Sequence, residues 1–198
     1  MAGYLTLAPE LDAFRQHYDQ LARDAESMAG ALTDEQFNWK PPSGGWSVAQ
    51  CLDHLNIATR SYLPALDEGI ADAIRRGLYG EGPFRYGWFA RMFVRTVGPG
   101  RRMRFTAPGA WRPPASRPRQ ETLAAFRAYQ VQCIDRLRQA NGLDLARAKV
   151  KSPASSLVRL PLGAAFDVLA SHAERHLAQA RRVMAEPAFP AERSTGTG

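Results

Sequence analysis

Apolar residues recur at steps of three and four over four long stretches of this 198-residue chain, and this repeat constrains its fold more than any other feature. Such steps follow the 3.6-residue turn of an α-helix, so each stretch would present one apolar stripe. The stripes occupy residues 11–32, 48–66, 123–137 and 162–183. Strand-like alternation of apolar and polar residues is nearly absent. The sequence therefore predicts an all-α fold, a four-helix bundle.

Capping residues predict where the second helix begins and ends. A loop rich in proline and glycine occupies residues 33–45. Ser47 follows it as the expected N-cap, and Gln50 stands three residues later, the spacing of a capping box. Pro64 lies inside the pattern, so we expect a kink or a break there, with the helix continuing to about Arg76.

The later helices have clear stop signals. The third follows Pro118 and is expected to end near Asn141-Gly142. Residues 144–160 are expected to form a connection without regular structure. The fourth helix begins at about Leu162 and is closed by Glu186-Pro187.

The length suits a single domain, which we expect over residues 1–190, followed by a disordered tail at 191–198. The sequence contains no run of about 18 apolar residues, so no membrane span is predicted. The N-terminus does not resemble a secretory signal, so a cytoplasmic location is expected. Cys51 and Cys133 fall within helical patterns and are expected to be reduced residues of the core.

Three histidines carry the strongest chemical signal. His172 and His176 are four residues apart, so on an α-helix both imidazoles project from one face. His54 lies in a separate helical stretch and would supply a third nitrogen. Three imidazoles leave one coordination position free for water or substrate, as in catalytic zinc sites.

The motifs around these histidines resemble those of the DinB/YfiT-like superfamily. They are Phe37-Asn-Trp39-Lys-Pro-Pro, Trp46-Ser-Val-Ala-Gln-Cys-Leu-Asp-His54-Leu and His172-Ala-Glu-Arg-His176-Leu-Ala-Gln. They occur in the order found in that family, and the resemblance spans about residues 10–185.

The resemblance implies an up-down-down-up bundle, commonly dimeric, with a long crossover connection. It implies a divalent metal, Zn²⁺ or Ni²⁺, bound by His54, His172 and His176. Family members of known activity include transferases and isomerases that use low-molecular-weight thiols. The expected function is therefore a metal-dependent, thiol-dependent transferase or a hydrolase acting on a small molecule through an activated thiol or water. The alternative is a non-catalytic, metal-stabilised bundle that serves as a sensor or an interaction module.

Other polar residues near the histidines are weaker candidates. Glu174 follows the first histidine of the pair by two residues and projects about 200° away from it, which suits a surface or supporting role. Asp53 points about 100° aside from His54 and is expected to pair with an arginine. Cys51 shares the face of His54, but a thiolate ligand there would close the open position.

Three further side chains receive structural interpretations. His17, one place from the apolar stripe of its helix, is expected to be partly exposed. Trp39 and Trp46 flank the loop before the second helix, and packing at the bundle end is favoured over contact with substrate.

Basic charge is concentrated in the connection over residues 77–118, which includes a possible short helix at 84–96. Between Gly77 and Arg119 there are nine arginines and one acid, Glu81, a local charge of +8 within a net charge of +7. The segment is interpreted as an insertion packed through its aromatics, or as a lid whose guanidinium groups bind an anionic substrate or thiol. A lipid-facing surface and a nucleic-acid contact are the remaining alternatives. The basic charge is not accompanied by a recognised nucleic-acid-binding motif.

Overall fold

The computed structural model describes residues 6–42, 44–99, 111–155 and 157–191. The elements in chain order are α1 (Pro9–Ala29), α2 (Asp34–Asn38), α3 (Val48–Arg75), α4 (Trp88–Val97), α5 (Arg119–Gln139), β1 (Lys149–Lys151), β2 (Arg159–Pro161) and α6 (Leu162–Met184). None of the helices formed by these residues is long and apolar enough to cross a bilayer. Beyond residue 191, the predicted tail lies outside the described residues, as do Arg101, Arg102 and Arg104.

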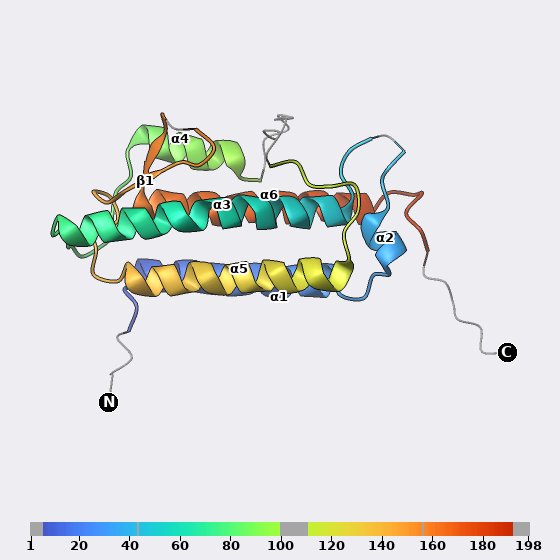
Figure 1. Cartoon of the computed structure of the whole chain (residues 1–198), viewed down its shortest axis with the longest axis horizontal. Helices are drawn as coiled ribbons and strands as arrows, with labels where there is room; N and C mark the ends of the chain where they lie inside the picture. The colour runs from blue at the N-terminus through green and yellow to red at the C-terminus, as the bar shows by residue number, and fades with distance from the viewer. Residues whose placement is uncertain (1–5, 43, 100–110, 156, 192–198) are drawn as a thin grey trace.

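The four long helices α1, α3, α5 and α6 lie side by side in two layers (Figure 1). One layer contains α3 and α6, and the other contains α1 and α5. Each long helix packs against two others: α1 and α3 both contact α5 and α6. The chain follows α1 and α6 in one direction and α3 and α5 in the opposite direction (Figure 1). The expected all-α class is confirmed, apart from one small sheet.

The start of α3 is the one that the capping residues predict. Ser47 accepts a hydrogen bond from the backbone N–H of Gln50, and the Gln50 side chain accepts one from the Ser47 N–H. The break considered at Pro64 does not occur, because the helix continues through it to Arg75. Pro64 and Arg60 are both exposed, so water can satisfy the Arg60 carbonyl that proline leaves without a helical donor.

Two regions expected to lack regular structure contain short elements. Helix α2 lies in the loop before α3 and has its own capping box, formed by Thr33 and Gln36. The predicted 144–160 connection contains β1 and the first residues of β2, which pair antiparallel with Val150 opposite Leu160. Strand β1 packs against α3 at Gly69, where an added Cβ would lie 2.8 Å from the Lys149 carbonyl oxygen. The packing of this small sheet therefore depends on position 69 of α3 being a glycine, which has no side chain.

The connection between α3 and α5 is long because these two helices run in the same direction, so the chain must return along the molecule between them. Helix α4 forms part of this return, starting four residues later than predicted, and packs against α6. Ala90 is buried, whereas Trp88 and Phe89 are 69% and 50% exposed. The α4 part of the insertion thus packs through only some of its apolar residues.

Large apolar side chains from all four long helices fill the interior. Tyr18, Phe126 and Phe166 are each about 1% exposed or less, and the Tyr18 hydroxyl donates to the Phe166 carbonyl oxygen at 2.8 Å. Full burial of each such side chain contributes about 1.5–3 kcal/mol to stability. Cys51 and Cys133 are free thiols within this core, which confirms the packing role predicted for them.

Candidate metal centre

The packing of α3 against α6 brings His54, His172 and His176 together. The Nε2 atom of His172 lies 3.3 Å from Nε2 of His54 and 3.1 Å from Nε2 of His176. One potential ligand atom from each residue lies within 4.8 Å of the other two. His54 and His176 are only 4% and 8% exposed, and His172 is partly buried. The convergence expected from the sequence is therefore present.

The spacing of these nitrogens fits one bound ion. Imidazole nitrogens bind Zn²⁺ at about 2.0–2.1 Å, so two ligands of one tetrahedral ion lie about 3.3 Å apart. The two Nε2 separations of 3.3 and 3.1 Å agree with this value. Neutral imidazole is also a donor that suits several divalent transition metals. The donor set and its spacing are therefore compatible with a three-histidine metal site.

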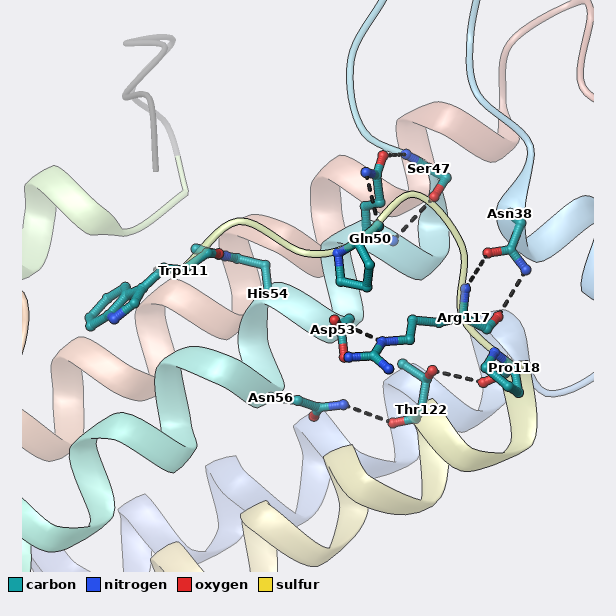
Figure 2. Close-up of polar contacts among 11 residues, drawn as sticks. Asn38, Ser47, Gln50, Asp53, His54, Asn56, Trp111, Arg117, Pro118 and Thr122 are labelled. Atoms are coloured by element: carbon teal, nitrogen blue, oxygen red, sulfur yellow. Dashed lines mark hydrogen bonds and ion pairs between the residues drawn. The ribbon is translucent and has the colours of Figure 1, made fainter. Parts of the chain in front are cut away.

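His54 is held in the tautomer that a metal ligand needs. Its Nδ1 atom lies 2.8 Å from the backbone carbonyl oxygen of Trp111 (Figure 2). A carbonyl oxygen can only accept, so Nδ1 must carry the proton and donate it. The Nε2 atom of the neutral ring then has a free lone pair, directed toward His172. A hydrogen bond from the second nitrogen to a carbonyl is the usual support for a metal-bound histidine.

Burial favours the neutral form of all three imidazoles. It lowers the pKa of His172 to about 3, and the charges of His54 and Arg175 act in the same direction. Burial likewise lowers the pKa of His176 well below its usual range. The pKa of His54 is lowered by burial too, although its hydrogen bond to the Trp111 carbonyl opposes that shift. At neutral pH no proton therefore competes with a metal for these nitrogens.

The second nitrogen of His176 has a different environment. Its Nδ1 atom is buried and has no hydrogen-bond partner of ordinary geometry among the described residues. Gln179, one turn later in α6, is nevertheless close enough for its side chain to raise the pKa of His176. Gln179 is therefore a polar neighbour of His176 rather than its hydrogen-bonded partner.

Trp46 forms one wall of the cluster. Its ring stacks on His176 with centroids 5.5 Å apart and an interplanar angle of 21°. It also contacts the His54 ring, with centroids 4.8 Å apart. Trp39, in contrast, packs edge-on against Phe189 near the C-terminal end, at 5.5 Å. The two tryptophans thus have different neighbours, although packing at the bundle end is the predicted role of both.

The weaker candidates lie where the sequence predicted. Asp53 forms an ion pair with Arg117, whose Nε atom is 3.2 Å from Oδ2, although the contact lacks hydrogen-bond geometry. Glu174 accepts a hydrogen bond of 2.8 Å from His17 of α1, which is partly exposed as expected. Cys51 is not among the residues that gather around the site. The expected partner of Asp53 and the outward position of Glu174 are confirmed.

One positive charge lies beside the histidines. Arg175 occupies α6 between His172 and His176, and its charge lowers the pKa of both. Its guanidinium donates a hydrogen bond of 3.3 Å to the carbonyl oxygen of Thr96, at the end of α4. The long connection is therefore linked to the site through α4 as well as through Trp111.

Three imidazoles, two buried and one partly buried, converge between two packed helices and define a helical protein whose candidate site can hold a metal ion. The family model of the DinB superfamily matches residues 17–180, a range that includes all three histidines. The chain belongs to the DinB superfamily, a group associated with metals. No curated protein and no solved structure matches the chain.

The sequence reasoning missed the contribution of Trp111. The atom that bonds His54 is a backbone carbonyl, which every residue type possesses, so no residue pattern marks it. The contact of Trp46 with two histidines was also not anticipated. A usable signal existed for Trp46, because it lies eight residues before His54 within one family motif.

Proposed function

We propose that this protein is a divalent-metal-dependent enzyme in which His54, His172 and His176 bind Zn²⁺ or Ni²⁺. Its reaction would be a thiol-dependent transfer or a hydrolysis on a small molecule. The observation that carries this proposal is the convergence of three neutral imidazoles, in which Nε2 of His172 lies 3.3 Å from Nε2 of His54 and 3.1 Å from Nε2 of His176. Membership of a metal-associated superfamily supports it.

A divalent ion at this site supplies Lewis acidity, which lowers the pKa of a bound water or thiol toward about 7. The residues of the chain set up that chemistry. The three imidazoles contribute no charge, so they would leave the positive charge of a bound ion unneutralised. Trp46 packs on His54 and His176 and limits the access of water from its side.

Arg175 favours an anionic substrate or thiol. Its charge acts at His172 and His176, so it also acts on a group bound next to them. A guanidinium beside a partly buried site attracts carboxylate or phosphate groups, and it also favours the thiolate form of a thiol. We therefore propose a small, negatively charged partner, such as a low-molecular-weight thiol that carries carboxylates.

The remaining features of the proposal rest on kinship. We propose that the described residues form one DinB-like domain, with α1, α3, α5 and α6 as its up-down-down-up four-helix bundle. The helix directions in Figure 1 support this topology. A homodimer and a cytoplasmic location are also proposed. A nucleic-acid partner is not proposed, because the basic segment lacks a recognised reading motif.

Elemental analysis of purified variants tests the metal site. We expect about one equivalent of divalent metal in the wild-type protein and almost none in the His172→Ala, His176→Ala double variant. His17→Ala serves as the control, because His17 pairs with Glu174 away from the cluster. Undiminished metal in the folded double variant would refute the assignment of these ligands.

The burial of the cluster favours one alternative, a non-catalytic protein stabilised by its metal. An ion shared by α3 and α6 would cross-link these two packed helices, and His54 is only 4% exposed. Ligand at 1,000 times its dissociation constant adds about 4 kcal/mol to stability. A chelator-induced drop in melting temperature, combined with no turnover across a panel of thiols and esters, would select this alternative.

A further inference from the structure

Residues 111–118, called the strap below, run along the first turns of α3 before α5 begins (Figure 2). The strap ends the long connection and bonds to α3 at three points and to α2 at a fourth. Its partners are His54, Gln50, Asp53 and Asn38. All of these contacts are made to backbone groups of the strap, except the ion pair with Asp53.

One end of the strap acts directly on the candidate site. The Trp111 carbonyl accepts a hydrogen bond from Nδ1 of His54 at 2.8 Å. The Trp111 ring also lies against His54 and Tyr62, with centroids 6.5 and 6.3 Å away. The position of this one peptide group therefore decides which nitrogen of His54 faces the other histidines.

The other end is fixed by Arg117. Its backbone N–H donates to the Asn38 side chain and its carbonyl accepts from the same side chain, both at 2.8 Å. Its guanidinium pairs with Asp53, a residue that is only 7% exposed and precedes His54 in α3. Asn38 belongs to the Phe37-Asn-Trp39 motif, whose purpose the sequence left open.

The span between the two ends is stiff. Pro113 and Pro114 follow Trp111 closely, and proline fixes the backbone angle φ near −65°. The Pro114 carbonyl accepts a hydrogen bond of 3.2 Å from Gln50, the residue that also caps α3. The two prolines and the Gln50 contact therefore restrict the backbone between Trp111 and Arg117.

We propose that the strap is a positioning element of the metal site, in which Asn38 and Arg117 hold the Trp111 carbonyl against His54. In this role Arg117 and Asn38 touch neither metal nor substrate, and they act through the tautomer and orientation of His54. The metal-binding part of the inference rests on the proposed function. The effect on His54 itself does not.

The test combines two readouts on the Arg117→Ala, Asn38→Ala double variant and on each single variant. The first is the tautomer of His54 in the metal-free protein, read from long-range ¹H–¹⁵N correlations of the imidazole rings while they are neutral. The second is the dissociation constant for Zn²⁺, measured by competition with a chromophoric chelator. We expect the double variant to lose the pure Nδ1–H signature and to bind Zn²⁺ about 10- to 100-fold more weakly.

Two controls separate positioning from general damage. Arg117→Lys keeps a cation for Asp53 and the backbone bonds to Asn38, so it should recover most of the affinity. Arg181→Ala removes an arginine of similar exposure together with its ion pair to Asp24 of α1, and it should leave both readouts unchanged. If the double variant does not fold, the single variant Asn38→Ala tests the positioning role by itself. The hydrogen bonds of the Asn38 side chain are exposed, so we expect this variant to fold.

The two proposals fail in different ways. If the wild-type protein does not bind Zn²⁺ or Ni²⁺, the proposed function fails. The tautomer of His54 in the strap variants still tests the positioning role of the strap in that case. If folded strap variants keep the wild-type tautomer of His54, the positioning role is overturned, whatever the metal affinity.

Discussion

Acidification should destabilise the metal-free protein, because its buried histidines resist protonation. Burial lowers the pKa of His172 to about 3, whereas an unfolded histidine has a pKa of about 6.5. As the pH falls below about 6.5, the unfolded chain gains a proton at this position and the folded protein does not. The free energy of unfolding therefore falls with pH, and stability is complete only above about pH 6.5.

The size of the effect follows from the shift. Each unit of pH below about 6.5 costs about 1.4 kcal/mol per histidine that stays neutral. His172 alone should therefore cost about 2 kcal/mol between about pH 8 and pH 5. The pKa values of His54 and His176 are also lowered by burial, so they add to the loss in the same direction. Such a loss is a large part of the stability of a single domain.

The measurement is urea unfolding at a series of pH values with a chelator present, on the wild-type protein and on His172→Gln. The variant removes one titrating group, so its free energy of unfolding should fall less steeply with decreasing pH. The difference in slope should correspond to one proton, about 1.4 kcal/mol per pH unit. Burial raises the pKa of Asp167, so the contribution of this residue to stability grows as the pH falls. Asp167 is present in both proteins, so its contribution cancels in the comparison. Parallel curves for the two proteins would refute the reasoning.

Two further outcomes test the packing. Gly69→Ala should lose about 1–3 kcal/mol in urea unfolding, because the new Cβ would lie 2.8 Å from a backbone oxygen of β1. Gly87→Ala, with nothing within 4 Å, should be close to neutral, and equal losses for the two would contradict the close approach of β1. Cys51 and Cys133 should not react with a thiol reagent until the protein unfolds, since burial raises the pKa of each to about 12. Rapid labelling of the native protein would show that these thiols are accessible.

The parts of the fold that sequence reasoning recovered are those with strong local causes. Ser47 and Gln50 mark the start of α3 because the capping box is a contact between neighbours in the chain. His172 and His176 share a face because helix geometry alone places them there. The third proposed ligand, His54, needed the family motif, since no local rule connects residues 118 positions apart.

The parts that it missed depend on contacts between distant segments or on elements too short to show a period. Strands β1 and β2 have three residues each, fewer than an alternating pattern requires. Helix α2 has five residues, although Thr33 and Gln36 carried a readable capping signal. Pro64 predicts a possible break on sequence alone, because proline removes a helical hydrogen bond. Its exposure makes that loss tolerable, but exposure depends on how α3 packs and cannot be known from the local sequence.

The distance along the chain between His54 and its two partners has a consequence for biosynthesis. A ribosome makes His54, in α3, 118 residues before it makes His172, the first of the two histidines in α6. The nascent polypeptide thus cannot assemble the three-imidazole pocket until α6 has been translated, and contacts of such long range form late in folding. Metal loading at the three-histidine site would accordingly follow the synthesis of α6.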